Sequence, residues 1–209
     1  PKAFSLHIHE DGVAELVFDA QEKSVNVFSS EAMAEFEAVL ENLERDRHLK
    51  ALLVRSAKES FIVGADVKEI YALAEAAEAV EKCVCGQRLF DRFARLRYPT
   101  VAAVHGLCLG GGTELALACT RRVLSDSPST RMGLPEILLG LAPGWGGTQR
   151  LARLVGLPQA LELTLTGKQV AAKPALRMGL ADAVFPEAVF LEESLKFIRD
   201  KVLPLKKLS

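Results

Sequence analysis

An apolar, strand-like run passes through three consecutive glycines into an apolar, helix-like run in Leu107-Cys108-Leu109-Gly110-Gly111-Gly112-Thr113-Glu114-Leu115-Ala116-Leu117-Ala118. A helix start presents unpaired N–H groups and the positive end of the helix dipole. It therefore stabilises an anionic ligand or an oxygen that gains charge in a transition state. Glu114 falls in the first turn, where the same field favours the carboxylate and suits it to act as a base. A tight turn with a dipole-stabilised glutamate is the structural alternative.

A second glutamate follows another glycine in Gly133-Leu134-Pro135-Glu136. Glycine has no Cβ, so the backbone beside it can approach a ligand closely. Two carboxylates in one pocket can divide proton transfer between them if their environments separate their pKa values. Glu114 and Glu136 are therefore the candidate catalytic pair.

A third glycine element lies upstream in Phe61-Ile62-Val63-Gly64-Ala65-Asp66-Val67-Lys68. An apolar run again turns through glycine into a helix, so the N–H of Ala65 could point into a pocket. Together with the N–H of Gly111 it could form an oxyanion hole with two donors. Asp66 by itself is more typical of a helix cap, and Lys68 is more typical of a solvated surface lysine than of a phosphate ligand.

The segment Gly140-Leu141-Ala142-Pro143-Gly144-Trp145-Gly146-Gly147-Thr148-Gln149-Arg150 is also rich in glycine. Its spacing fits neither GxGxxG nor a P-loop, which argues against nucleotide binding of those two types. Trp145, the single tryptophan of the chain, either walls an apolar ligand pocket or fills the core. His105 follows a buried strand and is predicted to be a satisfied core histidine. No serine lies in a GxSxG elbow, so a hydrolase of that type has no nucleophile.

Composition narrows the class of protein further. The chain has 209 residues, is 49% hydrophobic and carries a formal net charge of −1, which fits one domain with a sizeable core and argues against nucleic-acid binding. The chain contains no run of about 20 apolar residues, so the sequence predicts no transmembrane segment. The four cysteines show no CxxC spacing, so we expect no metal site and reduced thiols in a cytosol-like compartment.

Apolar periodicity predicts strands that alternate with helices, and hence an α/β layered domain. Strands are expected at 13–18, 49–55, 101–104 and 122–124. Ser30 is expected to cap a helix with Met33, Phe36, Leu40 and Leu43 on its inner face. Further helices are expected at 68–96, 113–120, 147–155, 158–165, 174–178 and 188–202.

These elements in combination closely resemble the crotonase, or enoyl-CoA hydratase/isomerase, superfamily. The resemblance rests on Phe61–Asp66, His105–Ala116, Gly133–Gly140 and Pro143–Leu151, with a later match from Leu165 to Asp182. It covers about residues 5–186. It implies a crotonase (ClpP/crotonase-like) α/β fold, a spiral of ββα units with C-terminal helices.

The resemblance also implies roles for individual residues. Ala65 and Gly111 match the positions whose amides bind the thioester oxygen, and Glu114 and Glu136 match the two catalytic glutamates of the hydratases. Asp66 and Lys68 match positions near the CoA nucleotide. The implied reaction is hydration of a 2-enoyl-CoA to a 3-hydroxyacyl-CoA, with no cofactor because CoA is part of the substrate. An enoyl-CoA isomerase is the runner-up, and a non-catalytic acyl-CoA-binding module is a more distant alternative.

The sequence departs from stand-alone hydratases in three respects. Glu114 and Glu136 are 22 positions apart, a longer spacing whose extra length falls at 125–132 and looks most like the N-terminal domain of multifunctional fatty-acid oxidation proteins. Trp145 is bulkier than the residue expected there, which leaves the acyl chain length open. The third departure is at the C-terminus, where the chain stops earlier than a stand-alone hydratase.

The domain prediction is a hydratase core at 1–186, followed at 187–209 by a helix and the start of a linker to a 3-hydroxyacyl-CoA dehydrogenase domain. The partners expected from the resemblance are an acyl-CoA thioester, a homo-oligomer or, in a longer protein, a thiolase subunit. The expected location is the cytoplasm, or the mitochondrial matrix in a eukaryote.

Overall fold

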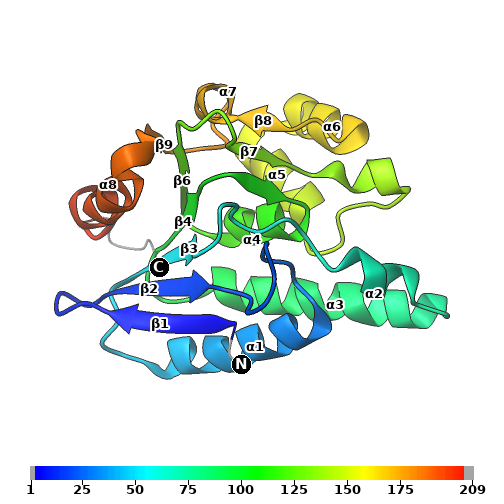
Figure 1. Ribbon diagram of the computed structural model, residues 1–209, viewed down its shortest axis with the longest axis horizontal. Helices are drawn as coiled ribbons and strands as arrows, with labels where there is room; N and C mark the ends of the chain where they lie inside the picture. Colours follow the sequence, from blue (N-terminus) through cyan, green and yellow to red (C-terminus); the bar gives the residue numbers. More distant parts are fainter. Residues whose placement is uncertain (1–2, 205–209) are drawn as a thin grey trace.

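The computed structural model describes residues 3–204. Its main sheet has six strands in the order β1-β2-β3-β4-β6-β9, namely β1 (Phe4–Ile8), β2 (Val13–Phe18), β3 (Ala51–Ser56), β4 (Thr100–Val104), β6 (Arg121–Ser125) and β9 (Ala183–Phe185). The β1–β2 pair is antiparallel, and all other neighbours in this sheet are parallel. Figure 1 shows this sheet running through the molecule with helices packed around it.

A second, smaller sheet contains β5 (Leu107–Leu109), β7 (Arg131–Gly133) and β8 (Val170–Ala171). β5 and β7 are parallel, and a parallel bridge between Ile62 and Cys108 extends the layer on the other side of β5. The four expected strands at 13–18, 49–55, 101–104 and 122–124 are confirmed within one or two residues. Within the second sheet, β5 agrees with the apolar, strand-like run before Gly110, whereas β7 and β8 were not predicted, because two or three residues give too little periodicity to detect.

The helices fall between these strands. They are α1 (Ser30–Arg45), α2 (Val67–Tyr71), α3 (Ala76–Ala94), α4 (Gly111–Ala118), α5 (Gly147–Val155), α6 (Leu157–Thr166), α7 (Ala172–Arg177) and α8 (Phe190–Phe197). Two short 3₁₀ helices, η1 (Pro135–Leu139) and η2 (Glu187–Val189), and a π-helical turn, η3 (Ile198–Val202), complete the set over the described residues.

A repeated unit generates both sheets. Each unit gives one strand to the main sheet, one strand or bridge to the second layer, and then a helix. The successive units are β3–Ile62–α2, β4–β5–α4 and β6–β7–η1. The structure therefore confirms the expected spiral of ββα units.

The faces of the main sheet follow the two-residue period of a strand. Leu52 and Val54 of β3 lie in the larger core, together with buried side chains of α1, α3 and α4. Leu53 points to the opposite face, where Phe190 and Ile198 at the start of α8 and of η3 cover it. Figure 1 shows α1 and α3 on one side of the sheet and α8 on the other. Residues 205–209 of the predicted linker lie outside the described residues.

Two details of the helices differ from the sequence predictions. The N-cap of α1 is Ser29, whose Oγ accepts the N–H of Ala32 at 3.2 Å, and not Ser30. The predicted helix at 68–96 is interrupted between α2 and α3. A new start at Glu75, with a reciprocal capping box to Glu78, competes with continuation of the helix.

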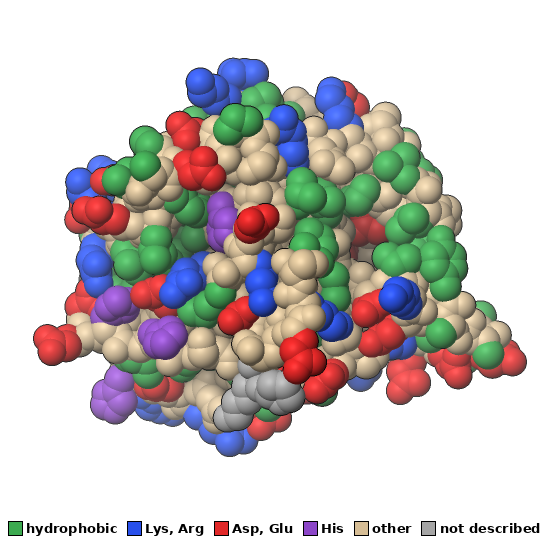
Figure 2. Space-filling view, viewed as in Figure 1, with side chains coloured by type: hydrophobic (Ala, Val, Ile, Leu, Met, Phe, Trp, Pro, Cys, Tyr) green, Lys and Arg blue, Asp and Glu red, His purple; other side chains and the backbone are tan. Residues whose placement is uncertain are grey.

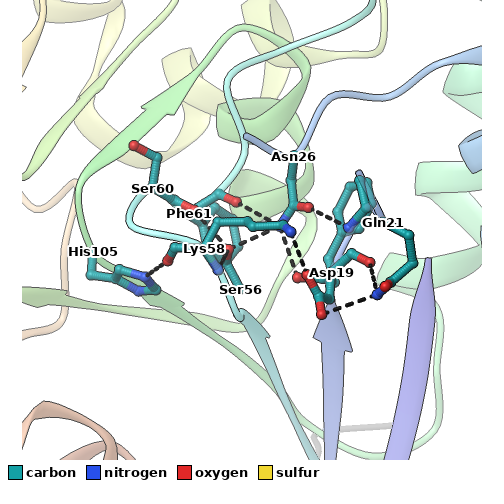
Figure 3. A network of polar contacts seen from close by, with 10 residues as sticks. Asp19, Gln21, Asn26, Ser56, Lys58, Ser60, Phe61 and His105 are labelled. Carbon is teal, nitrogen blue, oxygen red and sulfur yellow. Dashed lines mark hydrogen bonds and ion pairs between the residues drawn. The ribbon is translucent and has the colours of Figure 1, made fainter. Parts of the chain in front are cut away.

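A buried polar network joins the ends of β2 and β3 to the loop that follows (Figure 3). Asn26 is completely buried. Its Nδ2 donates to the Phe18 carbonyl at 2.8 Å and to Ser56 Oγ at 2.9 Å, and its Oδ1 accepts the Ala20 N–H at 2.8 Å. One carboxamide thus satisfies several buried groups that would otherwise lack partners.

His105 lies at the edge of the same network (Figure 3). Its Nε2 is 2.7 Å from the carbonyl oxygen of Lys58, and Lys58 Nζ lies 2.6 Å from an Asp19 carboxylate oxygen. This pairing confirms the prediction that His105 has a hydrogen-bond partner, although the residue is half-buried and does not lie in the core.

We expect Asn26→Ala to lower the free energy of unfolding by about 3 kcal/mol, because it leaves buried N–H and C=O groups unpaired. Urea denaturation followed by circular dichroism measures this change. The matched control is Gln21→Ala, which removes an exposed side chain that bonds only to Asp19 among the described residues and should change stability by less than about 0.5 kcal/mol. Equal stability of the two variants would contradict the assigned role of Asn26.

Candidate active site

A cavity of about 410 Å³ lies where the glycine elements of the three units meet. Its lining includes Ala65, Gly111, Glu114, Glu136 and Trp145. The structure thus brings together six of the seven predicted site residues in one hollow, because Asp66 also belongs to the lining. Part of the rim is apolar, and Figure 2 shows hydrophobic side chains gathered on the right of the view, where Figure 1 places α2 and α6.

Pairing between units aligns two backbone amides at this cavity. The Leu109 N–H donates to the Ile62 carbonyl at 3.0 Å, and a Cβ built on Gly64 would lie 4.0 Å from the Gly111 nitrogen. The N–H groups of Ala65 and Gly111 donate no hydrogen bond to any of the residues 3–204. Two adjacent unused donors are what an oxyanion site requires.

Neighbouring backbone fixes the Ala65 amide. The Phe28 N–H donates to the Gly64 carbonyl at 2.8 Å, and the Asp66 N–H donates to the Phe28 carbonyl at 3.0 Å. These bonds form a short parallel bridge between Phe28 and Ala65. Because both flanking peptides are held, the free N–H of Ala65 is fixed in direction.

Glu114 is 2% exposed. Its Oε1 accepts the N–H of Trp145 at 2.7 Å and the N–H of Gly147 at 2.8 Å. Burial raises the pKa of Glu114, although these two amides and the charge of Arg150 act in the opposite direction. Desolvation therefore acts against the field of the helix start, which by itself favours the carboxylate.

Glu136 is less completely buried than Glu114 but has fewer partners. Its Oε2 is inaccessible and accepts no hydrogen bond within the described part of the chain. A Cβ on Gly110 would lie 3.1 Å from its Oε1, so the carboxyl group sits against the start of α4. Burial raises the pKa of Glu136 to about 7, and the charge of Glu114 adds to the rise. A carboxyl group with this pKa can hold a proton near neutral pH.

Trp145 fills a slot between α3 and α4. A Cβ on Gly86 would lie 2.2 Å from Trp145 Cδ1, and a Cβ on Gly111 would lie 2.3 Å from Trp145 Cζ3. The indole meets the rings of Phe28 and Phe90 edge-on, with centroids 5.8 and 5.5 Å away. Trp145 also lines the cavity, so both alternatives predicted from the sequence apply: it plugs the core and walls the pocket.

The two candidates for CoA binding differ in position. Asp66 lines the cavity, and its carboxylate accepts the Lys68 N–H at 3.0 Å as the N-cap of α2. The cap interpretation of Asp66 is therefore confirmed. Lys68 is exposed on α2 and is not part of the lining.

A polar cluster at the cavity was not predicted. Lys82 Nζ lies 2.6 Å from Ser30 Oγ and 3.1 Å from Glu69 Oε2, and the Ser30 N–H donates to the Glu69 carboxylate at 3.0 Å. All three residues contribute to the lining. They come from α1, α2 and α3, so no spacing in the sequence signals the cluster.

The described residues contain neither a cluster suited to bind a metal ion nor a helix suited to cross a membrane. Residues 3–204 contain no group of three or more His, Cys, Asp or Glu side chains arranged to hold a metal ion. No helix in that range combines the length and the apolar character needed to cross a membrane.

A family model described as enoyl-CoA hydratase/isomerase matches residues 9–203. A relative from Vibrio campbellii, named fatty acid oxidation complex subunit alpha, is 47% identical over 192 residues. The match covers 91% of this chain but only 27% of the relative. The chain therefore spans about a quarter of the length of this curated relative.

Solved structures support the same family. An enoyl-CoA hydratase from Geobacillus kaustophilus superposes with a TM-score of 0.89 at 33% identity, covering 95% of this chain and 74% of the other. An enoyl-CoA hydratase from Bacillus anthracis gives a TM-score of 0.87 at 30% identity, covering 94% and 75%. These likenesses confirm the expected crotonase-type fold.

We expect Gly86→Ala to displace Trp145, because the new methyl group would overlap the indole. The fluorescence of this single tryptophan should shift to longer wavelength as the ring loses its slot, and stability should fall by about 1–3 kcal/mol. Val80→Ala, at an exposed position of the same helix, is the control and should leave the spectrum unchanged. An unchanged spectrum in Gly86→Ala would contradict the described packing.

The coupling of the two glutamates gives a second prediction. Glu114→Gln removes the negative charge that helps to raise the pKa of Glu136, so the pKa of Glu136 should fall. Carbon-13 NMR of the glutamate side-chain carboxyls, recorded as a function of pH, measures it. Glu162→Gln, an exposed substitution on α6, serves as the control. A pKa of Glu136 that does not change in Glu114→Gln would mean that the two carboxyl groups do not interact.

Proposed function

The chain belongs to the enoyl-CoA hydratase/isomerase family, and from that membership we propose that it hydrates 2-trans-enoyl-CoA thioesters to 3-hydroxyacyl-CoA in fatty-acid β-oxidation. The observation that carries the proposal is the pairing of two unused amides with the buried carboxyl group of Glu114 and the half-buried carboxyl group of Glu136 in one cavity. The names of the relatives point to the same chemistry.

The oxyanion site acts first in the proposed reaction. The N–H groups of Ala65 and Gly111 donate to the thioester carbonyl oxygen and polarise the conjugated double bond. Negative charge then moves onto this oxygen as water attacks C3. Loss of one such donor typically lowers the rate by about 10²–10³-fold.

The two glutamates divide the protons. Glu114 takes a proton from the attacking water as the bond from oxygen to C3 forms. Glu136 delivers a proton to C2 as the C2–C3 π bond breaks. Exchange with solvent then returns Glu114 to its carboxylate and Glu136 to its acid form. The raised pKa of Glu136, about 7, supports the donor role because it keeps the acid form populated near neutral pH.

The isomerase alternative uses the same groups. A carboxylate placed to exchange a proton at C2 could also move a proton from C2 to C4 of a 3-enoyl thioester. The presence of Glu114 beside Glu136 favours hydration, because isomerisation needs no group to activate water. A binding module without catalysis would not need a second, partly buried carboxyl group, whose desolvation is costly.

The proposal extends to cofactors, partners and location. The reaction requires no metal or redox group, since CoA enters as part of the substrate. The relative from Vibrio campbellii is named as a subunit of a fatty acid oxidation complex. We propose that this chain acts within a longer protein of that kind, in the cytoplasm, with a thiolase subunit as partner.

Loss of enoyl-thioester ultraviolet absorbance tests the proposal. The chain should consume crotonyl-CoA or decenoyl-CoA, and the preferred substrate will show which acyl length fits beside Trp145. Glu114→Gln and Glu136→Gln should each lower kcat by about 10²–10⁴-fold while CoA-ester binding persists. A 3-enoyl-CoA substrate tests for isomerisation in parallel. Binding without turnover of any substrate would instead support the binding module.

A further inference from the structure

The loop at 144–147, which supplies both amide donors to Glu114, is held from outside by two side chains. Gln87 Nε2 donates to the Gly144 carbonyl at 2.8 Å. Arg150 Nη1 donates to the Trp145 carbonyl at 2.8 Å. Neither Gln87 nor Arg150 contributes to the lining of the cavity. These two side chains are therefore not placed to contact a substrate directly.

One of these contacts acts on a peptide group that touches Glu114. The Gly144 carbonyl and the Trp145 N–H belong to the same peptide unit, and in a trans peptide they point in opposite directions. Gln87 holds the oxygen while the N–H donates to Glu114 Oε1. Holding the oxygen therefore aims the N–H at the carboxylate.

The guanidinium of Arg150 fixes the next peptide. Its Nη2 pairs with the carboxylate of Asp91, and its side chain is 15% exposed. A Cβ at Gly146, which has φ of +101°, would lie 2.3 Å from Nη1. Only glycine at position 146 leaves room for the guanidinium over this turn. The same turn directs the Gly147 N–H toward Glu114.

Both contacts originate from one face of α3. Gln87 and Asp91 are four residues apart on this helix, which places them one turn apart on the same side. The helix thus holds the loop directly through Gln87 and indirectly through the Asp91–Arg150 pair.

We propose that Gln87 and Arg150 are positioning residues that fix the 144–147 loop so that its two amides hold the carboxylate of Glu114 for catalysis. The inference rests on the proposed function for its catalytic consequence. The structural part of the inference follows from the contacts alone: Gln87 and Arg150 together form a clamp that holds the loop whose amides bind Glu114.

Charge gives the clamp a second effect. The ionisable groups that bear on Glu114 are Glu136 from η1 and Arg150 from α5, with Asp91 of α3 paired to Arg150. The cation of Arg150 opposes the rise in the pKa of Glu114 that burial causes. Its removal should therefore raise that pKa further and move the acidic limb of the pH profile to higher pH.

Steady-state kinetics with crotonyl-CoA form the first test. Arg150→Met should lower kcat by about 10- to 100-fold with KM little changed, and its acidic limb should move to higher pH. Arg150→Lys keeps the charge and should lose kcat without that shift. Gln87→Leu, at an exposed position, should lose about 10-fold in kcat. Arg153→Met, exposed on the same helix as Arg150, should behave like the parent chain.

Carbon-13 NMR titration of the Glu114 carboxyl group tests the clamp independently of enzymatic activity. The Glu114 signal is assigned by its loss in Glu114→Gln. The pKa of Glu114 should rise in Arg150→Met and stay at the parent value in Arg153→Met. Lack of hydration by the parent chain would overturn the proposed function, whereas a Glu114 pKa unmoved in Arg150→Met would overturn the clamp. If Arg150→Met does not fold, Gln87→Leu provides the test. A kcat and a Glu114 pKa in Gln87→Leu that both equal those of the parent chain would refute the proposal.

Discussion

Parallel pairing in the second layer is the constraint on which the rest of the molecule depends. Ile62 pairs with Cys108, and β5 pairs with β7, so three successive ββα units are stacked with their second strands in register. The carboxyl ends of these strands consequently meet at one edge. Each unit turns into a helix through glycine at this edge, which is why segments far apart in the sequence share one cavity.

The chemistry of the cavity depends on how closely glycine backbone approaches the two glutamate carboxyl groups. Gly110 allows the carboxyl group of Glu136 to rest against the start of α4, and Gly147 allows Glu114 to rest against the loop before α5. The two carboxyl groups lose water, and their pKa values rise. Glu114 recovers two amide hydrogen bonds whereas Oε2 of Glu136 has no partner among the described residues. This inequality of partners is the physical basis for giving the two glutamates different proton-transfer roles.

Much of this arrangement could be predicted from sequence, and the exceptions have identifiable causes. Long periodic elements such as α1 and β2 follow from the apolar pattern, and the glycine elements pointed to Ala65, Gly111, Glu114 and Glu136. The rise in the pKa of Glu114 was not predicted, because a helix dipole is visible in sequence and the extent of burial is not. The network around Asn26 and the clamp of Gln87 and Arg150 consist of side chains from separate elements. No local spacing encodes such contacts.

The stacked units also bear on how this fold can change its chemistry. Each functional segment occupies the same place in its own unit, after the second strand, and most of the hydrophobic core is formed by the sheet faces and helices. A substitution at Glu136 would remove one carboxyl group from the edge while the pairing that aligns Ala65 and Gly111 persists. An ancestral chain could therefore exchange one reaction for another by altering a single unit. The unused amides of Ala65 and Gly111 would be inherited unchanged, because they are backbone groups that side-chain mutation does not remove.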